Sequence, residues 1–153
     1  WPLACLIAKV FCMAGGEERY LPGNHPYDGT EQYADSASAS QCRFLYYQEK
    51  RSKEPLFQMN AASYGWLWQS HRLNRNLQKK AWRRISCPTR IFQAENETYV
   101  SKKEQERFVK KLCRRKRIDA KLIRVKGSKH EIFNSDPKTL EAYWDKILSY
   151  FKA

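Results

Sequence analysis

The sequence predicts an α/β fold in which parallel strands alternate with helices. Two short apolar runs favour strands, residues 88–94 and residues 120–125. Each run is followed by a stretch with helical spacing, residues 101–117 and residues 139–151. This alternation is typical of parallel strands joined by crossover helices. Because two strands are too few for a complete doubly wound sheet, we expect the remaining strands to lie outside this chain.

The first part of the sequence predicts short helices and loops with little strand. Residues 3–14 are apolar and stop at a Gly-Gly pair, which favours a helix that ends there. A second helix is expected to be capped by Ser36 and to end before Pro55. Residues 64–77 have apolar positions at helical spacing and predict a third helix.

The charge differs between the two halves of the chain. Lys and Arg number 29 against 16 Asp and Glu, and the net charge of +13 implies an anionic partner or surface. Residues 1–69 have a net charge of −1, whereas residues 70–153 have a net charge of +14. We therefore expect two structural units, a helical segment over 1–75 and a sheet-containing part over 76–153.

Hydrophobic residues make up 42% of the chain, and this share excludes a disordered protein.

The cysteines and the first residues of the chain indicate its redox state and its relation to a membrane. The sequence has five cysteines, an odd number, and they are widely spaced without a C-x-x-C pair. We therefore expect reduced thiols rather than disulfides or a structural zinc site. The apolar run over 2–14 contains Lys9 and is shorter than the about 20 residues that span a bilayer. The sequence starts at Trp1 rather than Met, which predicts a fragment of a longer chain.

Two polar loops follow the two predicted strands. The first is residues 95–100 (ENETYV) and the second is residues 127–131 (GSKHE). Because sites in open α/β sheets lie at the carboxyl ends of the strands, a carboxylate of one loop and the imidazole of His130 are expected to meet there. The carboxylate would then orient the imidazole for general-base catalysis. The alternative is that His130 is an ordinary hydrogen-bonding residue of a loop.

Residues 91–100 and residues 127–132 together resemble the last third of an α/β-hydrolase. They are most similar to bacterial inner-membrane lysophospholipases and their monoacylglycerol-lipase-like relatives, and residues 61–68 (AASYGWLW) resemble the segment between lid and core in that family. The resemblance implies a partial α/β-hydrolase fold with a helical lid, and cleavage of a carboxylic ester of a lysophospholipid or monoacylglycerol. It implies no metal and no organic cofactor, and a cytoplasmic protein peripheral to the inner membrane.

The resemblance also assigns roles to single residues. Glu97 falls on the position of the acid and His130 on the position of the catalytic histidine. Many relatives have Asp where this chain has Glu97, and the longer side chain leaves Glu95 as a second candidate for the acid. Glu131, beside the histidine, is expected to anchor the loop.

The nucleophile of such an enzyme is a serine on a G-x-S-x-G turn, and this sequence contains no such motif. In the family the motif precedes the lid, so the serine is expected upstream of Trp1, and this chain alone is expected to be inactive. Ser63, in the variant pattern A-x-S-x-G, is the internal alternative, but residues 56–60 form a poor strand and favour a helix start at Ser63. Ser128 is expected to be a turn residue.

The second half carries the basic surface. Residues 101–129 hold 13 Lys and Arg against three Asp and Glu, most densely at residues 114–117, and a second basic group lies over 72–84. The resemblance favours an anionic membrane as the partner. No zinc knuckle, RNP-type motif or G-x-x-G clamp indicates nucleic acid. A solvated helix face and a non-catalytic module that binds membrane or nucleic acid are the alternatives.

The aromatic residues of the first half gather around residues 64–68, where Tyr64, Trp66 and Trp68 lie close in sequence. Most of these side chains are expected in a small core. The alternative function for the cluster is an apolar wall for an acyl chain, opened by lid movement.

Overall fold

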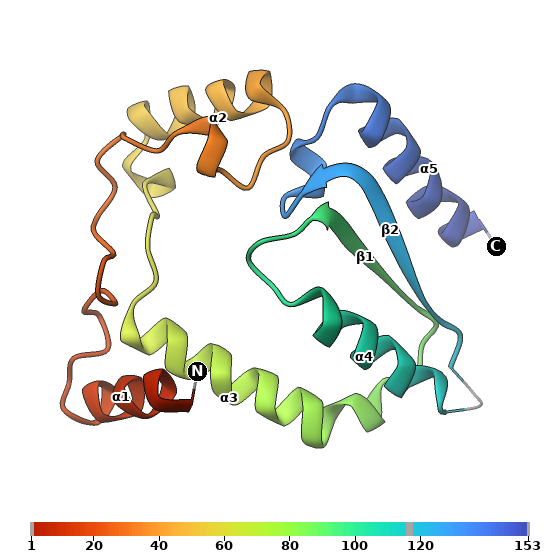
Figure 1. Ribbon diagram of the computed structural model, residues 1–153, viewed down its shortest axis with the longest axis horizontal. Coiled ribbons are helices and arrows are strands. Elements are labelled where there is room, and N and C mark those ends of the chain that lie inside the picture. Colours follow the sequence, from red (N-terminus) through yellow and green to blue (C-terminus); the bar gives the residue numbers. More distant parts are fainter. Residues whose placement is uncertain (1, 116–117, 153) are drawn as a thin grey trace. The chain divides into compact units, whose positions relative to one another are not determined.

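The computed structural model describes residues 2–115 and 118–152, which form helices and a two-stranded parallel sheet (Figure 1). The chain therefore belongs to the predicted α/β class. Its helices and strands are α1 (Pro2–Met13), α2 (Gln41–Lys53), α3 (Tyr64–Lys79), β1 (Thr89–Asn96), α4 (Lys102–Cys113), β2 (Ala120–Lys129) and α5 (Pro137–Lys152). Short 3-10 turns lie at Tyr33–Asp35, Pro55–Phe57, Ala81–Arg84 and Ile132–Asn134.

The two strands pair in parallel, as the alternation of elements predicts. Their register runs from Thr89 opposite Ala120 to Ala94 opposite Val125. An irregularity then follows, in which Asn96 pairs with Lys129, so β2 contributes more residues than β1 at this end. Gly127, with a φ of +72°, supplies the left-handed conformation that this bulge needs. The strand therefore extends through residues that the sequence placed in a loop, and ends directly before His130.

The helices α4 and α5 lie on opposite sides of the strands (Figure 1). Side chains alternate along β1, so that Gln93 donates hydrogen bonds to Lys102 O and Gln105 Oε1 of α4, while Phe92 packs edge-on against Tyr143 of α5. The core on the α5 side consists of Ala94, Val125 and Ile132, with Phe92 and Tyr143 packed against it. The crossover helix α4 and the following helix α5 thus hold the strands that carry the two polar loops.

Helix α4 confirms the predicted amphipathic pattern and is shorter than expected. Val109 and Leu112 are buried, and the capping serine Ser101 accepts a hydrogen bond from Glu104 N. The helix ends at Cys113, and Arg115 N donates a hydrogen bond to Leu112 O just beyond that end. Residues 116–117 of the predicted helix lie outside the described residues.

The chain divides into two compact units whose boundaries differ from the expected division at residue 75. The first unit is Trp1–Thr30 with Glu54–Ile85, and the second is Glu31–Lys53 with Ser86–Ala153. Residues 31–53 join the sheet-containing unit because they contact the loop after β2. In that contact, Ala39 N and Ser40 N both donate hydrogen bonds to Asn134 O.

Helix α2 begins at Gln41, not near Ser36 as the capping pattern predicts. Ser36 is 6% exposed and its hydroxyl donates to Tyr33 O, while Ser38 donates to Asn134 O. Ser36 and Ser38 therefore fix an irregular segment against the loop after β2. Ser40 takes the cap position instead, because its hydroxyl oxygen accepts a hydrogen bond from Arg43 N at 3.5 Å. Competition between local side-chain bonds and helix formation explains the shift.

In the first unit, α1 packs against α3. Ala8, Tyr64 and Leu67 form its core, and the Phe11 ring stacks on the Tyr64 ring with centroids 4.0 Å apart. A close backbone approach requires Gly65, since a Cβ there would lie 3.0 Å from the Glu17 carbonyl oxygen. The expected core is confirmed for Tyr64, whereas Trp66 is 61% exposed.

All five cysteines are free thiols, with Cys5 buried, Cys12 half-buried and the other three exposed. Within residues 2–115 and 118–152, no helix combines the length and the apolar character that a bilayer-spanning segment needs.

Candidate active site

The structure brings Glu97 and His130 into direct contact. Glu97 comes one residue after β1 and His130 one residue after β2, so the parallel strands deliver both to the same edge. Nδ1 of His130 lies 2.9 Å from Glu97 Oε1 and 2.8 Å from Oε2. The predicted meeting of a carboxylate from the first loop with the imidazole is therefore present.

The Glu97 carboxylate is buried and held by its own loop. Its side chain is 3% exposed, and Oε1 accepts hydrogen bonds from Tyr99 N at 2.8 Å and Val100 N at 3.2 Å. Burial alone would raise the pKa of this carboxyl, but the hydrogen bonds from His130, Tyr99 and Val100 together hold the pKa below its usual range. Glu97 is therefore a carboxylate fixed in place beside the ring.

The His130 side chain is 38% exposed, so one edge of the ring faces the carboxylate and the rest is open. When Nδ1–H donates to Glu97, Nε2 of the neutral ring is unprotonated and has a lone pair. None of the described residues forms a hydrogen bond with Nε2. This arrangement can accept a proton at Nε2 and stabilise the resulting imidazolium through Glu97.

The second candidate carboxylate is used elsewhere. Glu95 Oε2 accepts a hydrogen bond from Gly127 N at 2.8 Å, and the Glu95 carbonyl accepts one from Lys102 Nζ at 2.9 Å. Glu95 thus braces the bulge in β2, and the geometry favours Glu97 as the partner of the imidazole. Glu131 anchors the loop as expected, because its Oε2 accepts from Asn134 Nδ2 at 2.7 Å.

The two serine candidates have structural roles in this structure. Ser63 is the N-cap of α3, and its hydroxyl oxygen accepts a hydrogen bond from Trp66 N, which confirms the predicted helix start. Ser128 is fully buried and its hydroxyl donates to Val125 O at 2.7 Å. Ser128 therefore stabilises the bulge rather than facing the exposed ring edge of His130.

Two neighbours of His130 were not predicted from the sequence. The Tyr99 ring lies against the imidazole, with centroids 5.0 Å apart and planes 33° apart. Burial, followed by the nearby charge of Glu31, raises the pKa of the Tyr99 hydroxyl. The position of Tyr99 in the loop after β1 was the available signal, since that loop was already expected at the site.

The other unexpected neighbour is Lys129. Its ammonium group donates hydrogen bonds to the carbonyl oxygens of Tyr33, Ala34 and Ser36 at 3.4, 3.0 and 3.1 Å. It also lies 5.2 Å from the centre of the Tyr33 ring. The residue directly before His130 thereby ties the loop after β2 to residues 33–36, and no spacing in the sequence indicates such a long-range contact.

Lys129→Met is expected to lower the free energy of unfolding by about 1–3 kcal/mol, because three carbonyl oxygens lose a charged donor. Chemical denaturation measures the difference. Lys126→Met is the matched control, since Lys126 is exposed on the same strand. Equal stabilities of the two variants would contradict a structural role for the Lys129 ammonium.

Acid is expected to loosen the loop that carries Glu97. Its folded-state pKa lies below the ordinary value of 4.5, so the carboxylate stabilises the fold fully above about pH 4.5, and this stabilisation is lost as the pH falls through the folded-state pKa. Hydrogen-exchange protection of the Tyr99 and Val100 amides should fall in that range. Glu97→Gln should remove this pH dependence, and an unchanged acid transition in the variant would argue against Glu97 as its origin.

The basic surface of the second unit is partly neutralised by ion pairs. Arg124 pairs with Glu106 at 2.7 Å, and Arg107 pairs with Glu104 along α4. The side chains of Lys102, Lys103 and Lys110 are exposed on α4. Lys116 and Arg117, at the predicted maximum of basic charge, lie outside the described residues.

Comparison of the chain with protein-family models, with curated proteins and with solved structures found no match.

Proposed function

We propose that this chain supplies the acid and the base of a serine hydrolase with an α/β-hydrolase fold. The observation that carries the proposal is the contact between Glu97 and His130, which follow neighbouring parallel strands. The order of the elements supports it, because the acid follows one strand and the histidine follows the next. The proposed substrate is a lysophospholipid, and the proposed reaction is hydrolysis of its carboxylic ester.

In this mechanism, a serine from outside residues 1–153 attacks the ester carbonyl. Nε2 of His130 takes the serine proton, and the buried Glu97 carboxylate stabilises the imidazolium that forms. The same proton then passes from His130 to the leaving alcohol, which departs as the glycerophosphoryl product. Water, deprotonated by His130, hydrolyses the acyl-serine and releases the fatty acid. No metal or organic cofactor takes part in the proposed reaction.

The proposed location is cytoplasmic, at the surface of an anionic membrane, where such a substrate lies. Exposed lysines on α4 support electrostatic attraction to anionic headgroups. Binding of the chain to anionic vesicles is expected to weaken as salt rises from about 0.1 M to about 1 M, because the Debye length falls from about 10 Å to about 3 Å. Vesicle sedimentation measures this, and a binding curve that does not respond to salt would exclude the electrostatic attraction.

The enzymatic proposal is tested on the full-length protein, expressed from its complete reading frame. We expect release of fatty acid from lysophosphatidylcholine and labelling of one serine by a fluorophosphonate, which reacts with activated serines. Mass spectrometry of the labelled peptide locates the nucleophile. A label on Ser63 or Ser128 would overturn the proposed placement of the nucleophile outside these residues.

The same assay separates the other candidate functions. Faster turnover of a monoacylglycerol than of the lysophospholipid would replace the proposed substrate by the monoacylglycerol. Absence of both fatty-acid release and labelling would overturn the enzymatic proposal, and would leave a basic module that binds membrane or nucleic acid.

A further inference from the structure

Helix α1 has a second apolar face that no described part of its own unit covers. Cys5 and Ala8 are 3% and 0% exposed on the face that packs against α3. The large apolar residues of α1 that are exposed instead share the spacing i, i+3, i+4, i+7 and i+10, which places them on one stripe of the helix. They are Leu3 (69% exposed), Leu6 (57%), Ile7 (41%), Val10 (56%) and Met13 (78%).

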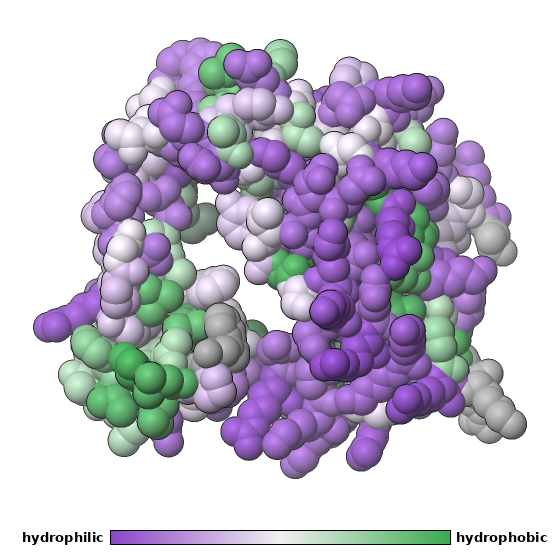
Figure 2. Space-filling model, in the orientation of Figure 1, coloured by the Kyte–Doolittle hydropathy of each residue, from purple (hydrophilic) through white to green (hydrophobic). Residues whose placement is uncertain are grey.

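This apolar stripe is a continuous surface feature. Figure 2 shows hydrophobic residues gathered over α1 at the lower left of the view. Scattered exposed leucines are ordinary on soluble proteins, but five large apolar side chains in one row on a 12-residue helix are not. Such a patch indicates a surface that binds a partner with an apolar surface of its own.

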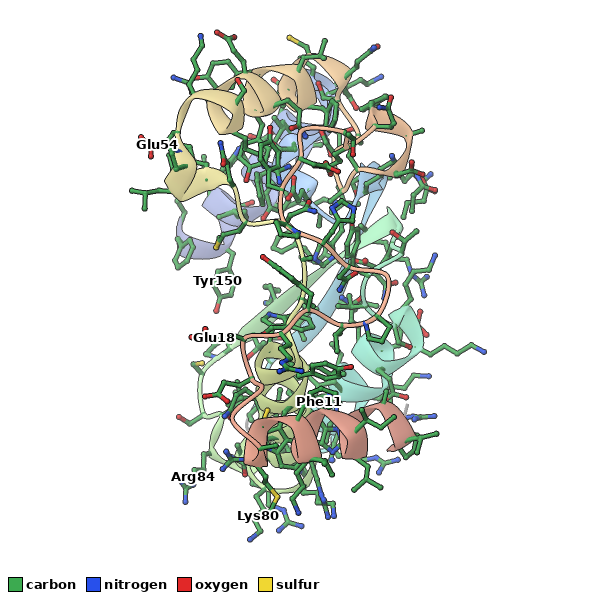
Figure 3. The ribbon with its side chains drawn as sticks, turned by 90° about the vertical axis from the view of Figure 1, so that its left-hand side faces the viewer. Phe11, Glu18, Glu54, Lys80, Arg84 and Tyr150 are labelled. Carbon is green, nitrogen blue, oxygen red and sulfur yellow. The ribbon has the colours of Figure 1, made fainter. Side chains whose placement is uncertain are left out.

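The charges of the same unit indicate the chemistry of the partner. The segments Pro2–Met13 and Tyr64–Arg84 contain no Asp or Glu. Figure 3 labels Lys80 and Arg84, which lie below α1 in that view, whereas Phe11 lies above it. The cations of these segments are Lys9, Arg72, Arg75, Lys79, Lys80, Arg83 and Arg84. A partner that is both apolar and anionic complements this surface.

We infer that α1 docks on an anionic lipid bilayer, with its apolar stripe in the interface and the cations of α3 and Ala81–Arg84 at the headgroups. A helix of 12 residues is about 18 Å long, which is shorter than the hydrocarbon core of about 30 Å, so α1 lies along the surface instead of crossing it. Apolar burial and attraction to anionic headgroups together determine the strength of such binding.

A bilayer fits this surface better than the other occupants. Nucleic acid would pair with the cations but would leave the apolar stripe exposed to water. A second copy would cover the stripe, but a two-fold contact between identical surfaces would bring two sets of cations together. The inference differs from the electrostatic attraction proposed for α4, because it requires insertion of apolar side chains, and it does not depend on the enzymatic proposal.

The test uses the 153-residue chain and flotation with vesicles of phosphatidylglycerol and phosphatidylcholine. The double variant Leu6→Glu/Val10→Glu is expected to weaken binding by roughly tenfold or more, because two apolar side chains leave the interface. The matched control is Leu56→Glu/Met59→Glu, which makes the same change in charge at residues that are 82% and 84% exposed in the same unit. All four side chains are exposed, and circular dichroism verifies that the variants fold.

Equal binding of the two double variants would overturn the inference, whether both bind well or both fail to bind. Equal binding of the unsubstituted chain to pure phosphatidylcholine vesicles would overturn the role of the cations. Sedimentation velocity tests the second copy: a dimer that Leu6→Glu/Val10→Glu dissociates would replace the bilayer as occupant. Loss of ester hydrolysis without loss of flotation would affect the proposed function and leave this inference intact.

Discussion

Replacing His130 by alanine is expected to lower kcat for ester hydrolysis by the full-length protein on the order of 10⁴-fold or more. The substitution removes Nε2, which accepts the proton of the nucleophile in the proposed mechanism, and with it the partner of the buried Glu97 carboxylate. The fold should survive, because the His130 side chain is 38% exposed and its loss leaves no buried cavity. Steady-state kinetics and thermal unfolding, measured on the same preparation, separate the two effects.

The chain offers matched controls for this substitution, because it has three histidines. His25 and His71 both belong to the first unit, and neither follows a strand of the sheet. His25→Ala and His71→Ala should therefore retain turnover close to that of the unsubstituted protein. Substantial turnover by His130→Ala would remove His130 from the mechanism.

The second large effect is expected when Glu97 is replaced by glutamine. The amide keeps the size of the side chain but has no charge to stabilise an imidazolium. Its NH₂ group can also donate to Nδ1, which favours the tautomer with the proton on Nε2, where the ring cannot accept the proton of the nucleophile. Comparable substitutions in serine hydrolases lower kcat by about 10⁴-fold. We expect a loss of about 10²- to 10⁴-fold for Glu97→Gln, with little change in KM. The ¹⁵N chemical shifts of the His130 ring report the change of tautomer independently of turnover.

Glu95→Gln is the matched comparison, because Glu95 lies two residues away and its carboxylate has a different partner. Its carboxylate accepts a hydrogen bond from Gly127 N, and a glutamine carbonyl oxygen can accept the same bond. We therefore expect kcat to fall by less than about tenfold, because the Gly127 N–H keeps a hydrogen-bond acceptor. If Glu95→Gln instead costs more than Glu97→Gln, the acid of the proposed mechanism is Glu95.

The contact between a carboxylate of the loop after β1 and the imidazole of His130 could be predicted because it depends on few choices. Apolar runs specify β1 and β2, the amphipathic helix between them specifies a parallel connection, and parallel strands end at one edge. The choice between Glu95 and Glu97 depends on a different kind of information. The bulge in β2 engages Glu95, because Gly127 N donates its hydrogen bond to the Glu95 carboxylate. The periodicity of a short strand does not reveal such a bulge.

The structure around Lys129 shows where prediction from sequence stops. The three carbonyl oxygens that accept from its ammonium group lie 93 to 96 residues away along the chain. Neither the charge of a lysine nor the serine-rich pattern of residues 36–40 specifies such a contact. The same contact places residues 31–53 with the sheet, whereas a division by charge and composition assigns them to the helical segment.

The two atoms of the Glu97–His130 contact belong to residues 33 positions apart, and the connection between them runs through α4. Closing a loop of this length costs on the order of 3 kcal/mol of chain entropy, and burial of Val109 and Leu112 of α4 must offset that cost. The contact therefore cannot form from local sequence alone. It is absent from any partly folded form in which α4 has not packed against the two strands. In the proposed mechanism, proton transfer at His130 therefore requires the packed α4, and a substitution of Val109 or Leu112 that loosens α4 would lower turnover although neither residue contacts the Glu97–His130 pair.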